Sequence, residues 1–294
     1  MDFFSISQLE QFSGIKAHTI RIWEQRYNAL SPSRSDGNTR SYDNAQLRRL
    51  LNISTLLQDG HKPSKLCKMS DNKLFQLMES KLTDNTLNDP SYEYFVSQLI
   101  VASTGFDEVY FDKIFSNCLL RLGMRDTYVK VIYPLLNRIG LLWAANKISP
   151  AYEHFCSNMV KQKLSAAIDA LPPPKSSRKS WLLFLRENEF HDIGLLFSYF
   201  LLKQAGKKVI YLGSNVPMDT LSQAVHETAP AHLFMFMVHY DSPEETNDYL
   251  KALKKLFGNT TIHISGNERL LSALKPAKEI NKISSVEELE KQLA

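Results

Sequence analysis

The sequence predicts a multidomain protein of the α and α/β class, and two observations carry this prediction. Residues 181–294 alternate short apolar runs with amphipathic segments, a pattern typical of a doubly wound parallel sheet. Residues 71–170 show helical spacing almost throughout, which favours packed helices over strands. With 294 residues, the chain is long enough for two or three such domains.

The bulk composition is that of an ordinary globular protein, with 44% apolar, 22% charged and 11% aromatic residues. No stretch approaches the roughly 20 uninterrupted apolar residues of a membrane helix. The amino-terminal residues lack the basic start and apolar core of a signal peptide. Three isolated cysteines, Cys67, Cys118 and Cys156, form neither a CxxC pair nor a disulfide framework. We therefore expect a cytoplasmic protein.

The positive charge of the chain is concentrated at its amino-terminal end. Residues 1–70 contain ten Lys/Arg and six Asp/Glu, a surplus that equals the net charge of +4 for the whole chain. The remaining residues are therefore close to neutral. A basic head on a neutral body favours binding of a polyanion.

The basic segment itself predicts three helices and a hairpin. The first helix, in residues 5–14, ends at Gly14, and the third runs from Asp43 as its cap to Gly60. Between the second and third helices, residues 31–42 (SPSRSDGNTRSY) are rich in turn-forming and basic residues, as in an exposed wing. The second helix, residues 16–27, buries Ile20, Trp23 and Tyr27 and leaves Lys16, His18, Thr19 and Arg21 on its free face.

The middle of the chain predicts a bundle of about four amphipathic helices with short connections. The segment that follows, LPPPKSSRKS (171–180), has three prolines and no apolar period, so we expect a linker there. The predicted domains are therefore residues 1–70, 71–172 and 180–294.

In the last domain, four apolar runs predict buried parallel strands: WLLFL, KVIYL, HLFMFMV and TIHIS. The segment ENEFHDIG (187–194) lies between the first strand and the first helix, at the edge of the sheet where such folds bind ligands. His191, flanked by Glu189 and Asp192, is therefore a candidate ligand-binding residue. A helix cap, a surface turn and a locally satisfied histidine remain open as alternatives.

The head resembles the winged helix-turn-helix of MerR-type transcription regulators. The features that carry the resemblance are TIRIWEQRY, a basic wing ending in N-x-R-x-Y (Asn38, Arg40, Tyr42) and an acidic cap before a leucine-rich helix. The resemblance implies a dimer that binds near-palindromic operator DNA and distorts it. Trp23 is expected in the small core. The residues expected to contact double-stranded DNA are Lys16, His18, Thr19 and Arg21 of the recognition helix and, at the phosphate backbone, Arg34, Arg40 and Tyr42 of the wing.

The segment around His191 resembles the corrinoid-binding motif D-x-H-x-x-G, with Glu189 in place of the aspartate, then His191 and Gly194. The resemblance implies that His191 is the lower ligand of cobalt, the one metal ligand predicted. A carboxylate at Glu189 would fix the tautomer and orientation of that imidazole. Gly194 would let the cofactor tail pass close to the backbone.

A second motif lies in the helical region, where Trp143 is followed after nine residues by Glu153-His154. This W-x9-E-H spacing is similar to that of the helical cobalamin-binding domain of CarH/LitR-like MerR-type repressors. Taken alone, the tryptophan suits a bundle core and the Glu-His pair suits a polar helix turn. The resemblance implies a winged helix-turn-helix head, a four-helix bundle and a flavodoxin-like (Rossmann-type) domain. Cobalamin, as adenosylcobalamin or methylcobalamin, is expected between the last two, in contact with Trp143, Glu153, His154, Glu189, His191, Asp192, Gly194, Gly213, Ser265 and Gly266.

Three positions depart from that family. Phe236, Met237 and Val238 stand where the family has S-x-L, and Ser265-Gly266 stand where it has Gly-Gly. These two departures predict a tail pocket that is narrower, holds an altered tail or is empty. Ala144 follows the tryptophan where light-sensing members have a histidine, which argues against light sensing.

We expect a non-enzymatic transcription regulator that binds its operator as a homodimer or higher oligomer, with repression favoured over activation. Cobalamin is expected to control this operator binding. One alternative keeps the fold but uses the last two domains for oligomerisation or protein interaction, without the cofactor. The other is an enzyme component that carries a methyl-corrinoid. Such a component does not need a DNA-binding head, so the head argues against this alternative.

Overall fold

The computed structural model describes residues 3–34, 39–58, 60–83, 92–144, 149–174, 179–238, 242–274 and 279–293. The chain divides into two compact units, Met1–Met159 and Val160–Ala294. The boundary falls inside the long helix α9 (Pro150–Asp169), which supplies residues to both. Asn38 of the predicted wing and residues 175–178 of the predicted linker lie outside the described residues. The three-domain division stays a prediction.

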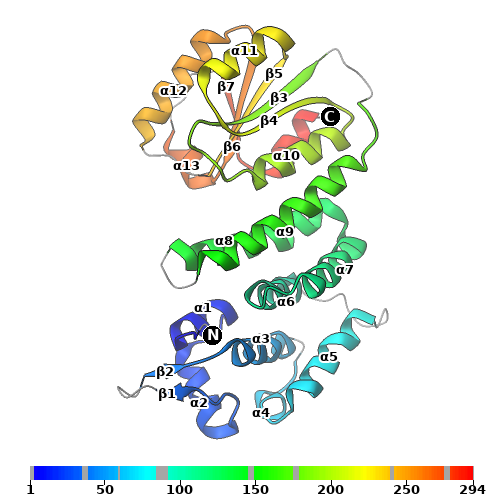
Figure 1. The fold of residues 1–294 in the computed structure, drawn as a ribbon, viewed down its shortest axis with the longest axis vertical. Coiled ribbons are helices and arrows are strands. Elements are labelled where there is room, and N and C mark those ends of the chain that lie inside the picture. The colour runs from blue at the N-terminus through cyan, green and yellow to red at the C-terminus, as the bar shows by residue number, and fades with distance from the viewer. Residues whose placement is uncertain are drawn as a thin grey trace. The chain divides into compact units, whose positions relative to one another are not determined.

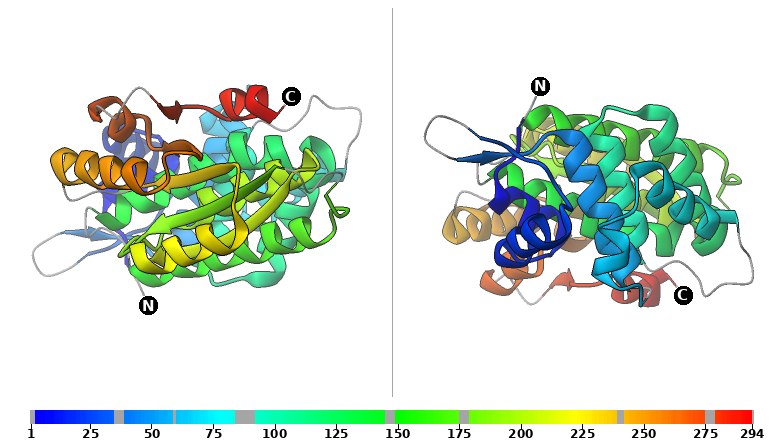
Figure 2. Two further views of the ribbon diagram at one scale, coloured as in Figure 1. Left: turned by 90° about the horizontal axis from the view of Figure 1, so that it is seen from above. Right: turned by 90° about the horizontal axis from the view of Figure 1, so that it is seen from below.

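The amino-terminal part of the first unit has the predicted three helices and a hairpin (Figure 1). A capping box at Ser5 begins the first helix, and Gly14, with φ of 72°, ends it in the left-handed conformation that glycine adopts without strain. The strands pair antiparallel and lie beside the first two helices (Figure 2). The elements are α1 (Ile6–Ser13), α2 (Ala17–Tyr27), β1 (Ser33–Arg34), β2 (Arg40–Ser41), α3 (Asn44–Gln58), α4 (Pro63–Leu66) and α5 (Asp71–Thr83).

The rest of the first unit is helical and is centred on α6. All its residues from Tyr94 to Thr104 are buried, because it packs against α3, α7 and α8. A π-helical turn, η1, joins α7 directly to α8. The predicted helical bundle is therefore confirmed. Its elements are α6 (Tyr92–Thr104), α7 (Glu108–Thr127), η1 (Tyr128–Ile132), α8 (Tyr133–Ala144) and the first part of α9.

Side-chain hydrogen bonds tie the amino-terminal part of this unit to its other helices. Asn44 Nδ2 of α3 donates to the carbonyl of Thr104 at the end of α6 over 3.2 Å. Arg138 of α8 pairs with both carboxylate oxygens of Glu93, at 2.6 and 2.9 Å. The same guanidinium donates to the carbonyl of Phe12 at 3.4 Å. These contacts fix the head to the helical part.

The second unit contains a parallel five-stranded sheet in the order β4-β3-β5-β6-β7. This is the flavodoxin-like order, in which ligands bind beyond the carboxyl ends of the strands. The four predicted strands are present, and the fifth (INKI) was missed because it is short and half polar. The elements are β3 (Ser180–Arg186), α10 (Ile193–Gln204), β4 (Lys208–Val216), α11 (Met218–Thr228), β5 (His232–Met237), α12 (Pro243–Leu256), β6 (Thr261–Gly266), α13 (Glu268–Ala273), β7 (Ile280–Ile283) and α14 (Val286–Leu293).

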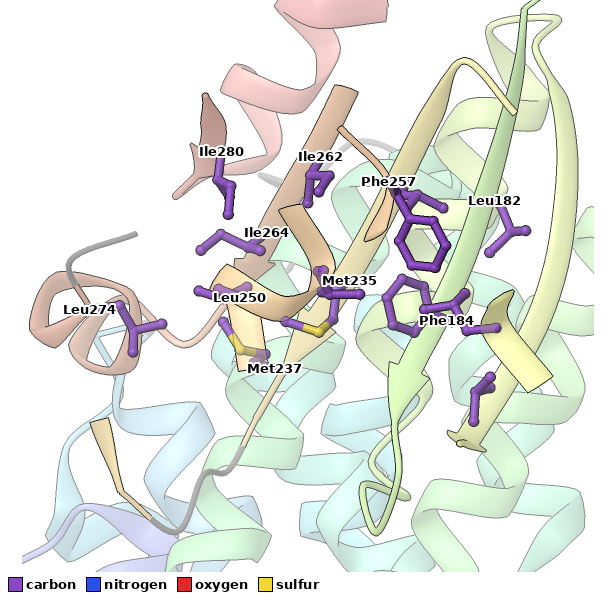
Figure 3. Close-up of a cluster of buried hydrophobic side chains, with 14 of the residues drawn as sticks. Leu182, Phe184, Met235, Met237, Leu250, Phe257, Ile262, Ile264, Leu274 and Ile280 are labelled. Carbon is purple, nitrogen blue, oxygen red and sulfur yellow. The ribbon is translucent and has the colours of Figure 1, made fainter. Parts of the chain in front are cut away.

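The two faces of this sheet carry different side chains. One face joins α11, α12 and α13 in an apolar core that includes Phe184, Met235 and Met237 (Figure 3). The prediction that the FMFM run is mainly buried strand is confirmed, although Phe236 is only half-buried. The opposite face, covered by α10, carries the intervening residues of the strands. Among the described residues, no helix combines the length and the apolar character needed to cross a bilayer.

Candidate functional sites

His191 lies in the turn between β3 and α10, at the carboxyl edge of the sheet. Its Nδ1 is 2.6 Å from Oε1 of Glu189, and its side chain is 56% exposed, whereas that of Glu189 is 5% exposed. A carboxylate on Nδ1 fixes the proton there, so Nε2 carries the lone pair that a metal needs. The arrangement is that of an oriented imidazole ligand.

The carboxylate of Glu189 also organises the turn. Its Oε1 accepts hydrogen bonds from the backbone N–H groups of Phe190, at 2.9 Å, and His191, at 3.0 Å. A buried carboxylate is stabilised by such donors, since they replace the water it has lost. Glu189 therefore holds both the ring and the backbone of His191, as predicted for a residue that orients the ligand.

Asn215 at the end of β4 anchors the same turn from the neighbouring strand. Its side-chain oxygen accepts from the N–H of Asn188 at 2.9 Å, and its own N–H donates to the carbonyl of Glu189 at 3.0 Å. Asn215 has φ of 55° and Asn188 has φ of 64°, a left-handed conformation that asparagine tolerates better than most residues. Of this loop, only Gly213 was predicted from the sequence as a cofactor contact. An asparagine just past a strand was the available signal.

Asp192 follows the histidine and begins α10. Its Oδ1 lies 2.7 Å from Nζ of Lys161 in α9, so its charge is already paired within the second unit. Beside it, the rings of Tyr199 and Tyr211 stack with centroids 5.2 Å apart. Burial, followed by the charge of Asp192, raises the pKa of Tyr211. Gly213, with φ of 81°, sits against the Tyr211 ring, so its role here is to shape β4.

The glycine and serine positions expected to line the cofactor tail have different partners. A Cβ added at Gly194 would lie 2.3 Å from two ring carbons of Phe236, so that ring rests on the bare Cα. The hydroxyl of Ser265 donates to the carbonyl of Ile283 at 2.8 Å. Gly266 has φ of 148° and a Cβ there would be 1.9 Å from the carbonyl oxygen of Met237. All three residues therefore take part in packing within the sheet domain, and their contact with a cofactor stays a prediction.

The second motif is described only in part. Trp143 lies in α8, and its side chain is outside the described residues. Glu153 is in the first turn of α9, where its Oε2 is 3.0 Å from Nδ1 of His154 and its other oxygen accepts from Ser157. His154 is 71% exposed. This second carboxylate-oriented imidazole is accessible to a ligand.

The predicted recognition helix presents its polar face to solvent. Lys16, His18 and Arg21 are exposed, Thr19 is half-exposed, and Trp23 is in the core as predicted. Arg34 of β1 is also exposed. These positions suit contacts with bases and phosphates.

Two wing residues require correction because both bind Glu24 of α2. Tyr42 is fully buried and its hydroxyl donates to Oε1 of Glu24 at 2.5 Å. Arg40 donates from Nε to the other oxygen of Glu24 at 3.1 Å, with its side chain 24% exposed. The predicted phosphate contact of Tyr42 is therefore wrong, and Arg40 mainly holds the wing to the recognition helix. Glu24, which makes both interactions, was missed because its partners lie 16 and 18 residues away.

Comparison with known families agrees with this geometry. Residues 4–73 match the model of the MerR HTH family regulatory proteins. Residues 95–168 match the model of a B12 binding domain. The chain therefore combines a MerR-type helix-turn-helix domain with a B12-binding domain.

Two curated relatives are similar to the chain over most of its length. It is 25% identical over 255 residues to the HTH-type transcriptional repressor CarH of Myxococcus xanthus, covering 86% of this chain and 84% of that protein. It is 24% identical over 243 residues to the HTH-type transcriptional repressor CarA of the same organism, covering 82% and 78%.

A solved structure shares the fold of the regulator. It is the monomethylamine corrinoid protein of Methanosarcina barkeri, with a TM-score of 0.52, 14% sequence identity and coverage of 69% of this chain and 98% of that one. The similarity supports the helical plus flavodoxin-like architecture.

The residues around His191 suit the corrin ring of a corrinoid better than its nucleotide tail. An exposed imidazole oriented by Glu189 suits a cobalt ligand, and Phe190 beside it is an apolar side chain 60% exposed to solvent. The space beneath, next to Gly194, is taken by Phe236. The site thus fits a corrin ring and does not fit a tail at that position.

The described residues do not provide cysteine thiolates for binding a metal. All three cysteines are buried, and burial raises the pKa of Cys118 to about 11 and of Cys156 to about 12. The described residues also contain no group of three or more His, Cys, Asp or Glu able to hold a metal ion. His191 would therefore act as a single axial ligand to a metal that brings its other ligands with it.

Proposed function

We propose that the chain is a transcriptional repressor whose operator binding is controlled by a corrinoid coordinated at His191. The observation that carries the proposal is the exposed His191 imidazole, held 2.6 Å from buried Glu189, in a chain that also has a DNA-binding domain. The relatives CarH and CarA are transcriptional repressors, which supports the same conclusion.

In corrinoid binding, the protein orients the His191 imidazole and supplies apolar surface to the corrin ring. Glu189 keeps the proton on Nδ1 of His191, so Nε2 is presented as the donor. Phe190 offers an apolar surface to the ring. A bound corrinoid would supply a cobalt ion that can exchange ligands. Trp143, Glu153 and His154 remain proposed contacts of the opposite face, from their spacing in the sequence.

DNA recognition is assigned to the exposed face of α2. Lys16, His18, Thr19 and Arg21 would meet bases and phosphates in the major groove, and Arg34 would meet the backbone. We propose a homodimer or higher oligomer, because near-palindromic operators match the symmetry of such assemblies. We also propose that the protein acts in the cytoplasm, as a protein that binds operator DNA.

The corrinoid can control this activity only by binding two states of the protein with different affinity. A gel-shift titration on the DNA upstream of the gene tests the proposal, with and without corrinoid, in darkness and in light. We expect the DNA affinity to change at least fivefold with corrinoid, equally in dark and light, and the change to be lost in His191→Ala. An unchanged affinity with every corrinoid would contradict the proposal.

A corrinoid-independent regulator is the second candidate, favoured by the Phe236 ring on Gly194. In that case the sheet domain serves oligomerisation or protein interaction. An absorbance scan of the protein mixed with corrinoid distinguishes the two, because only coordination by His191 shifts the cobalt spectrum. An enzymatic role has less support, since the curated relatives reported above are repressors.

A further inference from the structure

The chemistry of complete cobalamin sets a spatial requirement near His191. Its nucleotide tail, which ends in a benzimidazole base, hangs from the lower face of the corrin ring. An imidazole that coordinates cobalt from that face displaces the base. The tail must then lie on the protein side of the ring, beside the ligating histidine. The packing around His191 therefore decides which corrinoids are accepted.

The space beside His191 is filled by an aromatic ring. Gly194, three residues after the histidine, is in the first turn of α10, and Phe236 is near the carboxyl end of β5. Two carbons of the Phe236 ring lie 2.3 Å from the position of a Cβ at Gly194. Real contacts of this kind are much longer, near 3.5–4 Å. The ring therefore occupies the gap between the end of β5 and the start of α10.

The neighbouring positions close the same edge. Ser265 is the register partner of Phe236 on β6, and its hydroxyl is used by the carbonyl of Ile283 at 2.8 Å. At the next pair, Gly266 brings the backbone of β6 against the carbonyl of Met237. On the other side, Asn215 fastens the turn to β4. At each of these positions the chain's own backbone or side chains make the contacts.

We infer that this regulator binds, at His191, corrinoids that lack the nucleotide tail, of the cobinamide class, in preference to complete cobalamin. The inference rests on the proposed function, because it assumes that His191 coordinates a corrinoid. Phe236 forms a floor beneath the ring in place of a tail pocket. Phe190, exposed beside the ligand, adds apolar surface that a corrin ring covers.

The test is a parallel titration of the full-length protein with aquocobinamide and with aquocobalamin, followed by the cobalt absorbance spectrum. We expect wild type to bind aquocobinamide at least tenfold more tightly. Phe236→Ser, which opens the gap, should raise the affinity for aquocobalamin until the two differ by less than threefold. Phe190→Ser is the matched control, since it removes an exposed phenylalanine outside the gap and should weaken both corrinoids alike.

The wild-type comparison decides the inference even if Phe236→Ser does not fold. Equal or tighter binding of aquocobalamin by wild type, with its base displaced, would overturn the inference and leave the proposed function intact. If neither corrinoid binds, or if His191→Ala binds both as wild type does, the proposed function is lost and the inference with it.

Discussion

The side-chain amide of Gln98 donates a 3.1 Å hydrogen bond to Oδ1 of Asn52, and both residues are buried. The same amide accepts from the hydroxyl of Tyr110 at 2.7 Å. Asn52 belongs to α3 of the MerR-type segment, whereas Gln98 belongs to α6 of the segment that matches the B12-binding model. A buried polar connection therefore joins the two family domains within one compact unit.

The first prediction concerns this connection. Gln98→Leu leaves the buried Asn52 oxygen without its donor, so we expect the free energy of unfolding to fall by about 1–3 kcal/mol. The double variant with Asn52→Leu should regain part of that loss, because neither side then holds an unpaired polar group. Urea denaturation of the wild type and three variants gives the coupling energy. If the losses of the two single variants add up to that of the double variant, the two side chains are not energetically coupled.

The second prediction separates two roles of Asn215. Asn215→Gly and Asn215→Ala both remove the bond to the N–H of Asn188, but only alanine is strained at φ of 55°. We expect the alanine variant to be less stable than the glycine variant by about 1 kcal/mol. Both should bind a corrinoid more weakly than wild type, since the His191 turn loses an anchor. Thermal unfolding and absorbance titration measure the two effects. Identical stability of the two variants would contradict the strain argument.

The third prediction is a loss of stability in mild acid. Nδ1 of His232 lies 3.1 Å from Nε2 of His263, and both rings stack on Trp181. Burial, followed by the neighbouring His232, lowers the pKa of His263 from 6.5 to about 4. Burial, followed by nearby lysines, also lowers the pKa of His232.

The sign follows from proton binding. Between pH 6.5 and about 4, His263 binds a proton in the unfolded chain but stays neutral in the folded protein. The free energy of unfolding therefore decreases as pH falls through this window. The loss from His263 reaches at most about 3 kcal/mol. Urea denaturation between pH 7 and pH 4.5 measures it. His263→Gln should flatten the pH dependence, and His226→Gln, on the exposed side of α11, should leave it unchanged. A slope that survives in His263→Gln would assign the effect elsewhere.

The fourth prediction distinguishes DNA contacts from wing packing. Arg21→Ala removes an exposed cation of α2, so operator affinity should fall about tenfold and the salt dependence should weaken by about one counterion. Tyr42→Phe removes only the hydroxyl that binds Glu24, and should lower the melting temperature with the salt dependence unchanged. Fluorescence anisotropy at several salt concentrations compares them. A change of salt slope in Tyr42→Phe would restore Tyr42 as a phosphate contact.

The fifth prediction concerns Gly266. Gly266→Ala places a Cβ 1.9 Å from the carbonyl oxygen of Met237, so we expect a loss of more than about 3 kcal/mol in the free energy of unfolding. Gly258→Ala is the control, because its nearest neighbour is 3.4 Å away and its φ is ordinary. Chemical denaturation of both variants checks the difference. A mild effect at Gly266 would mean that β5 and β6 can separate locally.

Sequence reasoning predicted the features of the fold that depend on short-range sequence patterns. The helix ended by Gly14, the buried Trp23, the bundle and four of the five strands all follow from periodicity and local caps. The Glu189-His191 pair could be predicted for the same reason, since its members are two residues apart.

What sequence reasoning missed depends on contacts between distant segments. Tyr42 looked like a wing residue, and only the fold brings Glu24 beneath it. Asn215 gains its importance because β4 lies next to β3. The substitution at Phe236 was visible in the sequence, but its contact with Gly194 follows from the packing of α10 on β5.

The strand order of the sheet has a consequence for how a new chain matures during translation. Because β3 lies between β4 and β5, the first strand made gains one neighbour when β4 has left the ribosome and its second only after β5 has followed. Pairings of this non-local kind form slowly, and amino-terminal parts fold first. A nascent chain therefore completes the unit Met1–Met159 early, while the setting of His191 awaits the synthesis of Asn215 and Phe236. Each new molecule therefore completes its amino-terminal unit before the turn that carries His191 has all of its packing partners.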